Sequence, residues 1–510
     1  MSKKGIVYLI GAGPGDRDLI TIKGKELLQK ADVIVYDYLV NVDLLEYAKE
    51  SAEILYVGKK SGQKEMAQAS INALLVRKAS KGNIVARLKG GDPFTFGRGG
   101  EEAEALQAKN IPFEIVPGVS SVSAVPTYGG ISLTHRDFTS SFAVVTGHED
   151  PLKKKSNIPW DALSQIGTVV FLMGVSKLKK NMGELVKAGK NPETPVAIIT
   201  WGTYPQQRTL TGTIENISDL VKQHKEITSP GIVIVGEVVK LREIINWYET
   251  KPLFGKTIVV TRPKNQAYEF IKLLEGQGAN VIPFPTIEIT PPTSYKDLDK
   301  AINSIEQYDW IVFTSVNGVK SFFSRLKELN KDIRELYRAK IAAIGEVTAK
   351  EIECIGINVD VVPKDFKAEG LIRILKKEKI KDSKILIPRA KVARDILPES
   401  LVKIGAKVQV VTAYITKQPP KTKAKNIIKL LNENKIDMIT FTSSSTARNF
   451  FELIPDFKQK RNRPLLASIG PITDQTLRES GYKSALIPKK YTVDDLANDI
   501  VNYFTLQNLR

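Results

Sequence analysis

The sequence predicts an α/β protein of several domains, each with a sheet flanked by helices. Apolar runs of strand length alternate with segments of helical periodicity along the chain, which is typical of parallel sheets covered by helices. The 510 residues are 42% hydrophobic and 26% charged, which are ordinary globular proportions. At about 150 residues per domain, this length indicates roughly three domains.

The first half contains two such patterns in succession. In the first, helices are predicted at 21–31 and 63–81, and strands at 6–13, 32–37, 53–59 and 83–93, the last running into a loop. In the second, strands are predicted at 140–148, 167–174, 194–200 and 231–239. We therefore expect one domain over residues 1–250, with subdomains of about 1–118 and 119–248. It ends at the turn-rich segment 248–255.

The second half, residues 254–510, contains an internal repeat. Three pairs of segments match in the same order, namely 309–323 with 437–451, 342–363 with 467–488, and 256–284 with 383–411. In the last pair, Arg262 corresponds to Arg389. The half therefore consists of two related α/β modules, and a cleft between such modules is the usual place for a small ligand.

The residue types exclude several classes of protein. Cys354 is the single cysteine, which rules out a disulfide framework and a zinc site built on several thiolates. The three histidines, at 135, 148 and 224, lie far apart in the sequence, so we expect no metal site. No apolar stretch approaches 18 residues, and the first residues lack the apolar core of a signal peptide. We expect a soluble cytoplasmic protein with no membrane partner.

The chain carries an excess of positive charge. Residues 1–250 have a net charge of +4 (31 Lys and Arg against 27 Asp and Glu), and residues 251–510 have one of +15 (44 against 29). Such an excess is typical of proteins with a polyanionic partner, although solvated helix faces rich in Lys produce the same count. No aromatic and basic stripe accompanies it, so nothing in the sequence supports a nucleic-acid partner.

Two glycine-rich loops stand out in the first half. GAGPGD (11–16) lies between a predicted strand and helix, but Asp16 takes the place of the last glycine of a dinucleotide-binding motif, so by itself it indicates only a tight turn. RLKGGDPFTFGRGGEE (87–102) interleaves five glycines with charged and aromatic residues. Glycines let backbone amides approach a ligand closely, and Asp92 can accept hydrogen bonds from that ligand. We interpret the second loop as a binding site.

With these loops, residues 5–248 resemble the uroporphyrinogen-III C-methyltransferases of the tetrapyrrole methylase family. The matching segments occur in the family's order: VYLIGAGPGDRDLITIKG, DVIVYDYLV, YVGKKSG, RLKGGDPFTFGRGGEE, VPGVSS, ISLTHRD, VTGH and FLMG. The resemblance implies the two-subdomain tetrapyrrole methylase fold and a homodimer. It also implies S-adenosylmethionine as the methyl donor, with S-adenosylhomocysteine as its product.

The resemblance assigns roles to single residues. The implied cofactor contacts are Pro14, Gly90, Gly91, Asp92, Thr95, Ser120, Ser121, Met173 and Gly202. Asp37 matches the family's proposed proton acceptor and Lys59 its proposed proton donor. The alternatives are a helix cap for Asp37 and a solvated charge for Lys59. His135 and Arg136 are candidates for contacts with substrate carboxylates, and the alternative for His135 is a packed, hydrogen-bonded side chain.

The chemistry agrees with these roles. Methyl transfer from a sulfonium to carbon needs alignment and no metal. An aspartate at a strand end suits the proton that the methylated ring must release. Arg17, Thr95 and Ser132 depart from the family's commonest residues without removing a group that the reaction needs.

Residues 254–510 resemble uroporphyrinogen-III synthase. The matching segments include IVVTRP (258–263), VIPFPTIEI (281–289), DWIVFTSVNGV (309–319), AAIGEVTA (342–349), FTSSSTARNF (441–450) and ASIGPIT (467–473). The resemblance implies a two-domain fold with parallel sheets flanked by helices. One domain comprises about 254–289 plus 413–510, and the other comprises about 290–412. It also implies cyclisation of hydroxymethylbilane without a cofactor, and the eight carboxylates of that substrate account for the positive charge of this half.

Several residues of the second half are candidates for this reaction. Polar side chains that follow paired strands are expected to bind substrate carboxylates: Thr314, Ser315, Asn317, Thr442 and Ser443. Helix capping is the alternative role for the Ser and Thr residues, and both roles can hold together. Arg262 and Arg389 are expected to face the cleft. Tyr414 matches the family's candidate acid, and the alternative is a buried strand tyrosine.

Together the two resemblances imply a bifunctional enzyme. The second half would make uroporphyrinogen III, and the first half would methylate it twice to precorrin-2. The alternative is an active methyltransferase fused to a non-catalytic tetrapyrrole-binding module. The sequence leaves open whether the product serves sirohaem or cobalamin biosynthesis.

Overall fold

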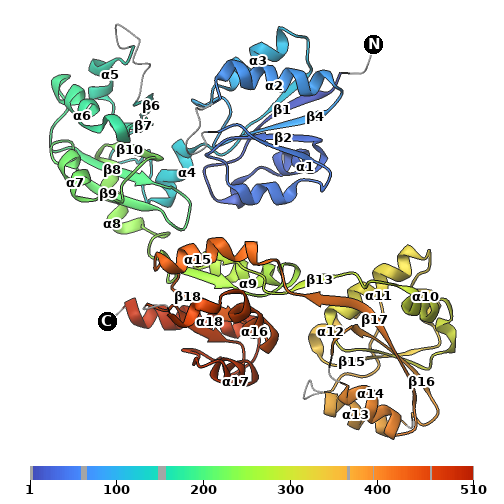
Figure 1. The fold of residues 1–510 in the computed structure, drawn as a ribbon. Coiled ribbons are helices and arrows are strands. Elements are labelled where there is room, and N and C mark those ends of the chain that lie inside the picture. The colour runs from blue at the N-terminus through green and yellow to red at the C-terminus, as the bar shows by residue number, and fades with distance from the viewer. Residues whose placement is uncertain are drawn as a thin grey trace. The chain divides into compact units, whose positions relative to one another are not determined.

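The computed structural model describes residues 4–58, 66–147, 157–363, 368–378, 380–393, 395–459 and 462–508. These residues form four sheets flanked by helices, two in each half of the chain, which confirms the predicted α/β class (Figure 1). The chain divides into two compact units. One comprises Met1–Thr257, Leu273–Asn280 and Val501–Arg510, and the other comprises Ile258–Lys272 and Val281–Ile500.

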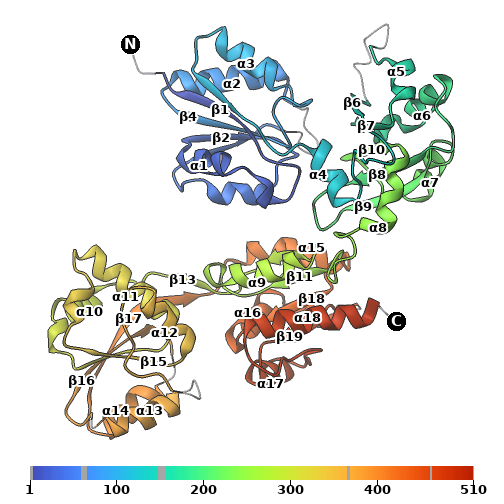
Figure 2. The ribbon, with the colours of Figure 1, turned by 180° about the vertical axis from the view of Figure 1, so that it is seen from behind.

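The first sheet is entirely parallel, in the order β3-β2-β4-β1-β5. Its strands are β1 (Ile6–Gly11), β2 (Val33–Tyr36), β3 (Glu53–Tyr56), β4 (Ile84–Lys89) and β5 (Phe113–Val116). Helix α1 (Ile22–Lys30) covers one face, and α2 (Gln68–Ser80) and α3 (Gly99–Gln107) cover the other (Figures 1 and 2). Because all five strands are parallel, their carboxyl ends and the loops that follow them lie at one edge.

The second sheet is mixed, in the order β6-β7-β10-β8-β9. Its strands are β6 (Phe142–Thr146), β7 (Thr168–Leu172), β8 (Pro195–Thr200), β9 (Arg208–Thr213) and β10 (Gly231–Val235). Only β6 and β7 pair in parallel, and β10 runs antiparallel to both β7 and β8. The accompanying helices are α4 (Ser121–Tyr128), α5 (Trp160–Gln165), α6 (Leu178–Lys187), α7 (Ile217–Gln223) and α8 (Arg242–Ile245).

The second half contains two sheets, ordered β12-β11-β18-β19 and β13-β17-β16-β14-β15. The strands of the first are β11 (Thr257–Val260), β12 (Asn280–Pro283), β18 (Met438–Phe441) and β19 (Leu465–Ser468). Those of the second are β13 (Glu288–Thr290), β14 (Trp310–Phe313), β15 (Lys340–Ala343), β16 (Lys384–Ala390) and β17 (Lys407–Lys417). The predicted limits of the inserted domain, 290 and 412, fall at the end of β13 and within β17. These two strands pair antiparallel and carry the chain from one sheet to the other.

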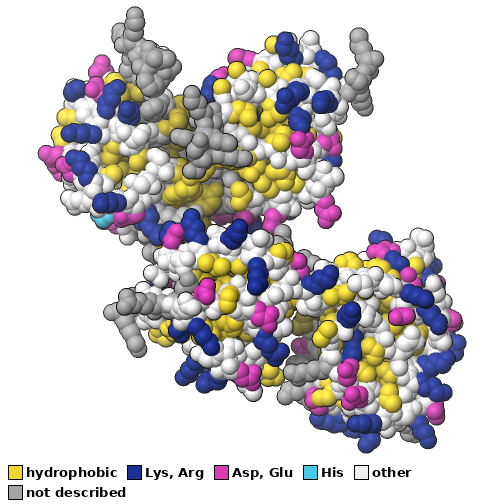
Figure 3. Space-filling model, in the orientation of Figure 1, with side chains coloured by type: hydrophobic (Ala, Val, Ile, Leu, Met, Phe, Trp, Pro, Cys, Tyr) yellow, Lys and Arg dark blue, Asp and Glu magenta, His cyan; other side chains and the backbone are white. Residues whose placement is uncertain are grey.

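The helices of this half are α9 (Lys264–Gly276), α10 (Lys296–Asn303), α11 (Val316–Glu328), α12 (Glu346–Glu353), α13 (Ala368–Lys377), α14 (Ile396–Lys403), α15 (Lys425–Asn432), α16 (Ser444–Leu453), α17 (Pro471–Glu479) and α18 (Val493–Asn508). Most helices of this half follow a strand, although β12 is followed directly by β13, α12 by α13 and α17 by α18. In Figure 3, Lys and Arg side chains are frequent over the domain that contains α10 to α14. Within the described residues, no helix is long and apolar enough to cross a membrane.

The fold confirms the predicted repeat. Strands β12-β11-β18-β19 correspond in order to β17-β16-β14-β15. Ser315 and Ser443 are the N-caps of α11 and α16, with nearly identical φ and ψ of −166° and 153°, and −165° and 159°. Gly345 and Gly470 occupy the N-caps of α12 and α17 in the same way. The two modules therefore place equivalent helix starts at equivalent strand ends.

Candidate active sites

Four glycines bring the loops after β1, β4 and β5 into backbone contact. A Cβ added to Gly11 would lie 2.4 Å from the Gly118 Cα, and one added to Gly118 would lie 2.3 Å from the Gly91 carbonyl oxygen. Gly13 and Gly91 exchange backbone hydrogen bonds of 2.7 and 3.2 Å. Both have positive φ, of 79° and 68°. Only glycine allows this close approach, so the three loops form one surface of exposed backbone groups.

Asp92 holds that surface in shape. Its Oδ1 accepts hydrogen bonds from the backbone of Phe94 at 2.9 Å, and from the backbone and hydroxyl of Thr95 at 2.9 and 3.1 Å. Its Oδ2 accepts from the Gly118 backbone at 3.1 Å. The carboxylate thus ties its own loop to the loop after β5. Two predicted cofactor contacts, Asp92 and Thr95, are therefore hydrogen-bonded to each other.

Most of the other predicted cofactor contacts also lie at the carboxyl edge of the first sheet. Gly91 faces Ser120 and Ser121, since a Cβ added to Gly91 would lie 3.7 Å from the Ser121 backbone nitrogen. Ser120 caps α4 and accepts from the Val122 backbone at 3.2 Å. Pro14 lies in the loop after β1, and Gly90 packs against the side chain of Leu39.

The second subdomain contributes the loop after β8. Gly15 lies against the ring of Tyr204, and the Asp16 backbone donates to the Thr203 hydroxyl at 2.9 Å. Gly202 packs on Val125 of α4. Trp201 lies edge-on to Tyr38, with 6.3 Å between ring centroids. This loop therefore reaches the glycine surface.

Met173, after β7, is 52% exposed and has a φ of 57°. Trp201 and Thr203 also have positive φ, of 50° and 69°. Strained backbone of this kind is often found at functional sites. No described contact joins Met173 to the glycine loops.

Asp37, whose side chain is 28% exposed, contacts a buried group of charged side chains. Its Oδ2 accepts from the Arg87 Nη2 at 3.1 Å, and its Oδ1 accepts from the Leu39 backbone at 3.3 Å. The Glu102 Oε1 accepts from the Arg87 Nε at 3.1 Å and from the Lys89 Nζ at 3.0 Å. Burial and the charge of Arg87 lower the pKa of Lys89. Asp37 is thus both a turn cap and the ion-pair partner of a buried arginine.

Arg87, Lys89 and Glu102 are functional candidates that sequence patterns alone do not identify. Charged residues do flank the glycines in RLKGG and GGEE, but the sequence does not show that those before the loop pair with one after it. That pairing becomes visible only in the folded structure. Lys59, the predicted proton donor, lies outside the described residues. His135 lies in a turn and accepts from the Asp137 backbone at 3.2 Å, and Arg136 is exposed. No described contact links either of them to the glycine loops.

These features fit a nucleoside-containing cofactor such as S-adenosylmethionine. Backbone groups at the glycine loops and at the N-cap of α4 can hydrogen-bond its polar atoms, and Gly91, with its positive φ, leaves that surface free of a side chain. Among the described residues, no group of His, Cys, Asp and Glu is arranged to hold a metal ion.

The second half has a polar cavity of about 210 Å³. It is lined by Arg262, Pro263, Gln266, Ile287, Ile289, Asn317, Thr416, Thr442, Ser443, Ser445 and Thr446. These residues come from both sheets, and Gln266 donates to the Asn317 Oδ1 across them at 3.1 Å. The cavity therefore brings together four predicted residues, Arg262, Asn317, Thr442 and Ser443. Gln266 and Thr416 were missed because amide and hydroxyl side chains carry little signal by themselves.

Arg262 supplies the positive charge of this cavity. Its Nε is buried and has no hydrogen-bond partner among the described residues, and burial lowers the pKa of its guanidinium. The described lining contains no carboxylate. A half-buried guanidinium whose lining holds no carboxylate favours an acidic ligand, since pairing would recover the cost of removing it from water.

Tyr414 and Ser315 form a second polar pair. Their hydroxyl oxygens lie 3.1 Å apart, and Tyr414 is 8% exposed at the edge of an apolar core. Ser315 also accepts from the Gly318 backbone at 3.1 Å. Thr314 is half-buried beside it. Arg389, in contrast to its counterpart Arg262, forms an ion pair with Asp395.

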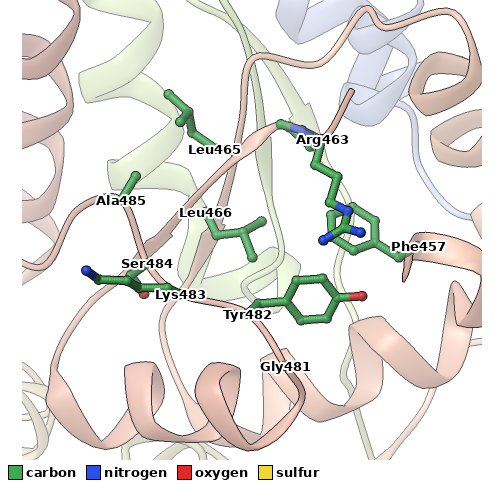
Figure 4. Close-up of a pocket in the computed structure, with 10 residues that line it drawn as sticks. Phe457, Arg463, Leu465, Leu466, Gly481, Tyr482, Lys483, Ser484 and Ala485 are labelled. Carbon is green, nitrogen blue, oxygen red and sulfur yellow. The ribbon is translucent and has the colours of Figure 1, made fainter. Parts of the chain in front are cut away.

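A larger cavity, of about 480 Å³, lies at the start of β19 (Figure 4). In Figure 4, Arg463 reaches toward Phe457 and Tyr482, and its guanidinium carbon lies 5.6 Å from the centroid of the Tyr482 ring. None of the predicted site residues lines it. We therefore place the candidate site of this half at Arg262.

Comparisons with known proteins match both halves. The model of the family Tetrapyrrole (Corrin/Porphyrin) Methylases matches residues 6–218, and that of Uroporphyrinogen-III synthase HemD matches residues 268–498. A porphyrin biosynthesis protein HemD from Ruminiclostridium josui is 40% identical over 494 residues, covering 96% of this chain and 94% of that protein.

Two further relatives match shorter parts of the chain. A uroporphyrinogen-III C-methyltransferase from Bacillus subtilis strain 168 is 42% identical over 364 residues, covering 71% of this chain and 74% of that protein. An S-adenosyl-L-methionine-dependent uroporphyrinogen III methyltransferase from Methanosarcina barkeri is 50% identical over 247 residues, covering 48% of this chain and 96% of that protein. The chain therefore belongs to the porphyrin biosynthesis proteins in which a tetrapyrrole methylase is fused to a uroporphyrinogen-III synthase of the HemD type.

Proposed function

We propose that this chain is a bifunctional enzyme of tetrapyrrole biosynthesis. The second half cyclises hydroxymethylbilane to uroporphyrinogen III, and the first half methylates that product twice to precorrin-2. Membership of the fused family supports both activities. The observation that carries the methyltransferase half is the convergence of three glycine loops beside Asp37 at one edge of a parallel sheet.

In the methyltransferase, Gly90, Gly91, Ser120 and Ser121 would hold S-adenosylmethionine, together with Pro14 and Gly202. The cofactor supplies an electrophilic methyl group when bound. Asp37 is oriented by Arg87 and accepts the proton that the substrate ring releases. Asp92 and Thr95 keep the loop in its binding shape.

In the synthase, the +15 charge of the half attracts the polycarboxylate substrate, and Arg262 pairs with one of its carboxylates. Asn317, Thr442 and Ser443 donate further hydrogen bonds in the same cavity. Tyr414 donates a proton to the terminal hydroxyl of the bilane, which leaves as water and gives an azafulvene-like cation that forms the ring-closing carbon–carbon bond. Inversion of the last pyrrole ring then requires that the bond between this ring and its bridging methylene breaks and re-forms at the ring's other side. A ring proton is released at the end and returns to the tyrosine oxygen, so the proton balance closes without a cofactor.

The decisive experiment incubates the full chain with hydroxymethylbilane, with and without S-adenosylmethionine, and identifies the products. We expect the type III isomer in both reactions and its dimethylated derivative only with the methyl donor. Spontaneous type I product alone, together with methylation of supplied uroporphyrinogen III, would indicate the non-catalytic binding module. The homodimer, the cytoplasmic location and the roles of Lys59, His135 and Arg136 stay predictions.

A further inference from the structure

Glu102 is the centre of the buried charges near Asp37. Its carboxylate is 0% exposed, and Oε1 accepts from Arg87, from Lys89 and from the Gln68 amide at 3.2 Å. Its Oε2 is buried and has no hydrogen-bond partner among the described residues. A buried carboxylate that is only half satisfied is costly, so its presence calls for a role besides stability.

The place of Glu102 in the fold connects the two parts of the methyltransferase site. Lys89 is the last residue of β4 and Glu102 lies in the first turn of α3, so their ion pair closes the base of the loop between them. That loop contains Gly90, Gly91 and Asp92. Arg87 lies on the same face of β4 as Lys89, because side chains alternate along a strand.

Arg87 carries the connection on to Asp37. Its Nε donates to Glu102 and its Nη2 donates to Asp37, so one rigid guanidinium joins the two carboxylates. The group contains two cations and two carboxylates and is balanced when all are charged. Without the charge of Glu102, two buried cations would face Asp37 alone, and Arg87 would lose the partner that orients it.

We propose that Glu102 is a positioning residue for methyl transfer, which orients Asp37 through Arg87 and anchors the start of the cofactor loop through Lys89. The inference rests on the proposed methyltransferase function and adds to it a coupling between the proton acceptor and the loop. Glu102 itself touches neither substrate nor cofactor.

The test uses the full chain with uroporphyrinogen III and S-adenosylmethionine. Glu102→Gln keeps the shape of the side chain and removes its charge. Arg87→Lys keeps the positive charge but removes the guanidinium group that donates to both carboxylates. Glu104→Gln changes an exposed residue of the same helix and is the control. We expect kcat to fall at least about tenfold for the first two variants and to stay at the wild-type value for the control. For Arg87→Lys, the Kd for S-adenosylhomocysteine should change by less than about twofold, because Lys89 and Glu102 still anchor the loop.

A compensating variant separates positioning from simple packing. Lys89→Gln in the Glu102→Gln background restores the balance of charge, so we expect it to recover part of the lost kcat. Losses that simply add, or wild-type kcat in both Glu102→Gln and Arg87→Lys, would overturn the inference. If Glu102→Gln does not fold, as judged by near-ultraviolet circular dichroism, Arg87→Lys decides alone. Failure of the wild-type chain to methylate would overturn the proposed function, and this inference with it.

Discussion

Asp37 combines two roles that the sequence presents as alternatives. Its carboxylate caps the turn after β2 and also pairs with Arg87. The motif could be found in the sequence, but the arginine that orients it lies 50 positions away. Pairings of this kind need the register of neighbouring strands, which local patterns do not contain.

The proton-acceptor role of Asp37 predicts a separation between chemistry and binding. Asp37→Ala should lower the methylation rate by at least about 10²-fold, because the general base is lost. The Kd for S-adenosylhomocysteine, measured by calorimetry, should stay near the wild-type value. Asp161→Ala, an exposed change on α5, serves as the control. Normal methylation by Asp37→Ala would show that the residue is only a cap.

Arg262 should affect function and stability in opposite directions. Arg262→Met removes a charge-assisted contact worth about 1.5–3 kcal/mol, which is roughly ten- to hundredfold in the KM for hydroxymethylbilane. Its melting temperature should not fall, because an apolar side chain replaces a half-buried guanidinium whose Nε has no hydrogen-bond partner among the described residues. Arg325→Met is the matched comparison, since Arg325 pairs with Asp299 at 2.7 Å and should lose stability without a change in KM. An unchanged KM for Arg262→Met would remove Arg262 from the site.

Tyr414 can be tested with the loss of one hydroxyl. Tyr414→Phe should slow formation of the type III isomer and leave the melting temperature nearly unchanged, since the ring still fills the core. Ser315→Ala should lower the melting temperature as well, because Ser315 also caps α11. If Tyr414→Phe keeps the wild-type rate, the tyrosine is a core residue with no part in the reaction.

At the scale of elements, the positions of the strands could be predicted from the sequence more reliably than their pairing into sheets. Short continuous apolar runs such as IVYLIG and VIVY are typical of buried strands, so β1 and β2 could be predicted from the sequence. Strand β9, RTLTGT, was missed because its side chains are polar or half-buried. Helix α3 was missed because it starts with two glycines, which hide its periodicity. The antiparallel pairing of β10 depends on chain direction, which apolar patterns do not reveal.

The loop after β4 gives a prediction at this scale. Asp92→Ala removes the acceptor of four hydrogen bonds, so the loop should lose its shape and S-adenosylhomocysteine should bind about tenfold more weakly. The KM for uroporphyrinogen III should change less. Asp92→Asn should be intermediate, because it keeps the contacts of Oδ1 but sets an amide NH₂ against the Gly118 N–H. Unchanged cofactor titration by Asp92→Ala would contradict this role of the loop.

For the whole molecule, the division into halves was predictable because each half has its own motifs and its own sheets. The charge difference of +4 against +15 supported the same division. The finer domain boundaries stay predictions. Residues Leu273–Asn280 and Val501–Arg510 group with the first unit, and the Leu253 backbone donates to Gln277 at 2.9 Å.

We predict that separated fragments 1–250 and 254–510 fold and keep their own activities, since each is long enough to bury a core. The first should methylate supplied uroporphyrinogen III, and the second should form the type III isomer without S-adenosylmethionine. Circular dichroism checks folding, and product analysis checks activity. If the second fragment yields only the type I isomer, adding back the first distinguishes a need for the missing half from an inactive module.

The duplicated modules of the second half also record a divergence between two copies of one ancestral unit. At the offset that relates Arg262 to Arg389, the residue matching Asp395 is Tyr268. In one copy, Arg389 forms an ion pair with Asp395. In the other, the Nε of Arg262 is buried and has no hydrogen-bond partner among the described residues. Likewise, Asn317 corresponds to Ser445, and both line the same cavity. Two identical copies would present the same groups to both ends of a linear substrate, whereas these two copies present different ones.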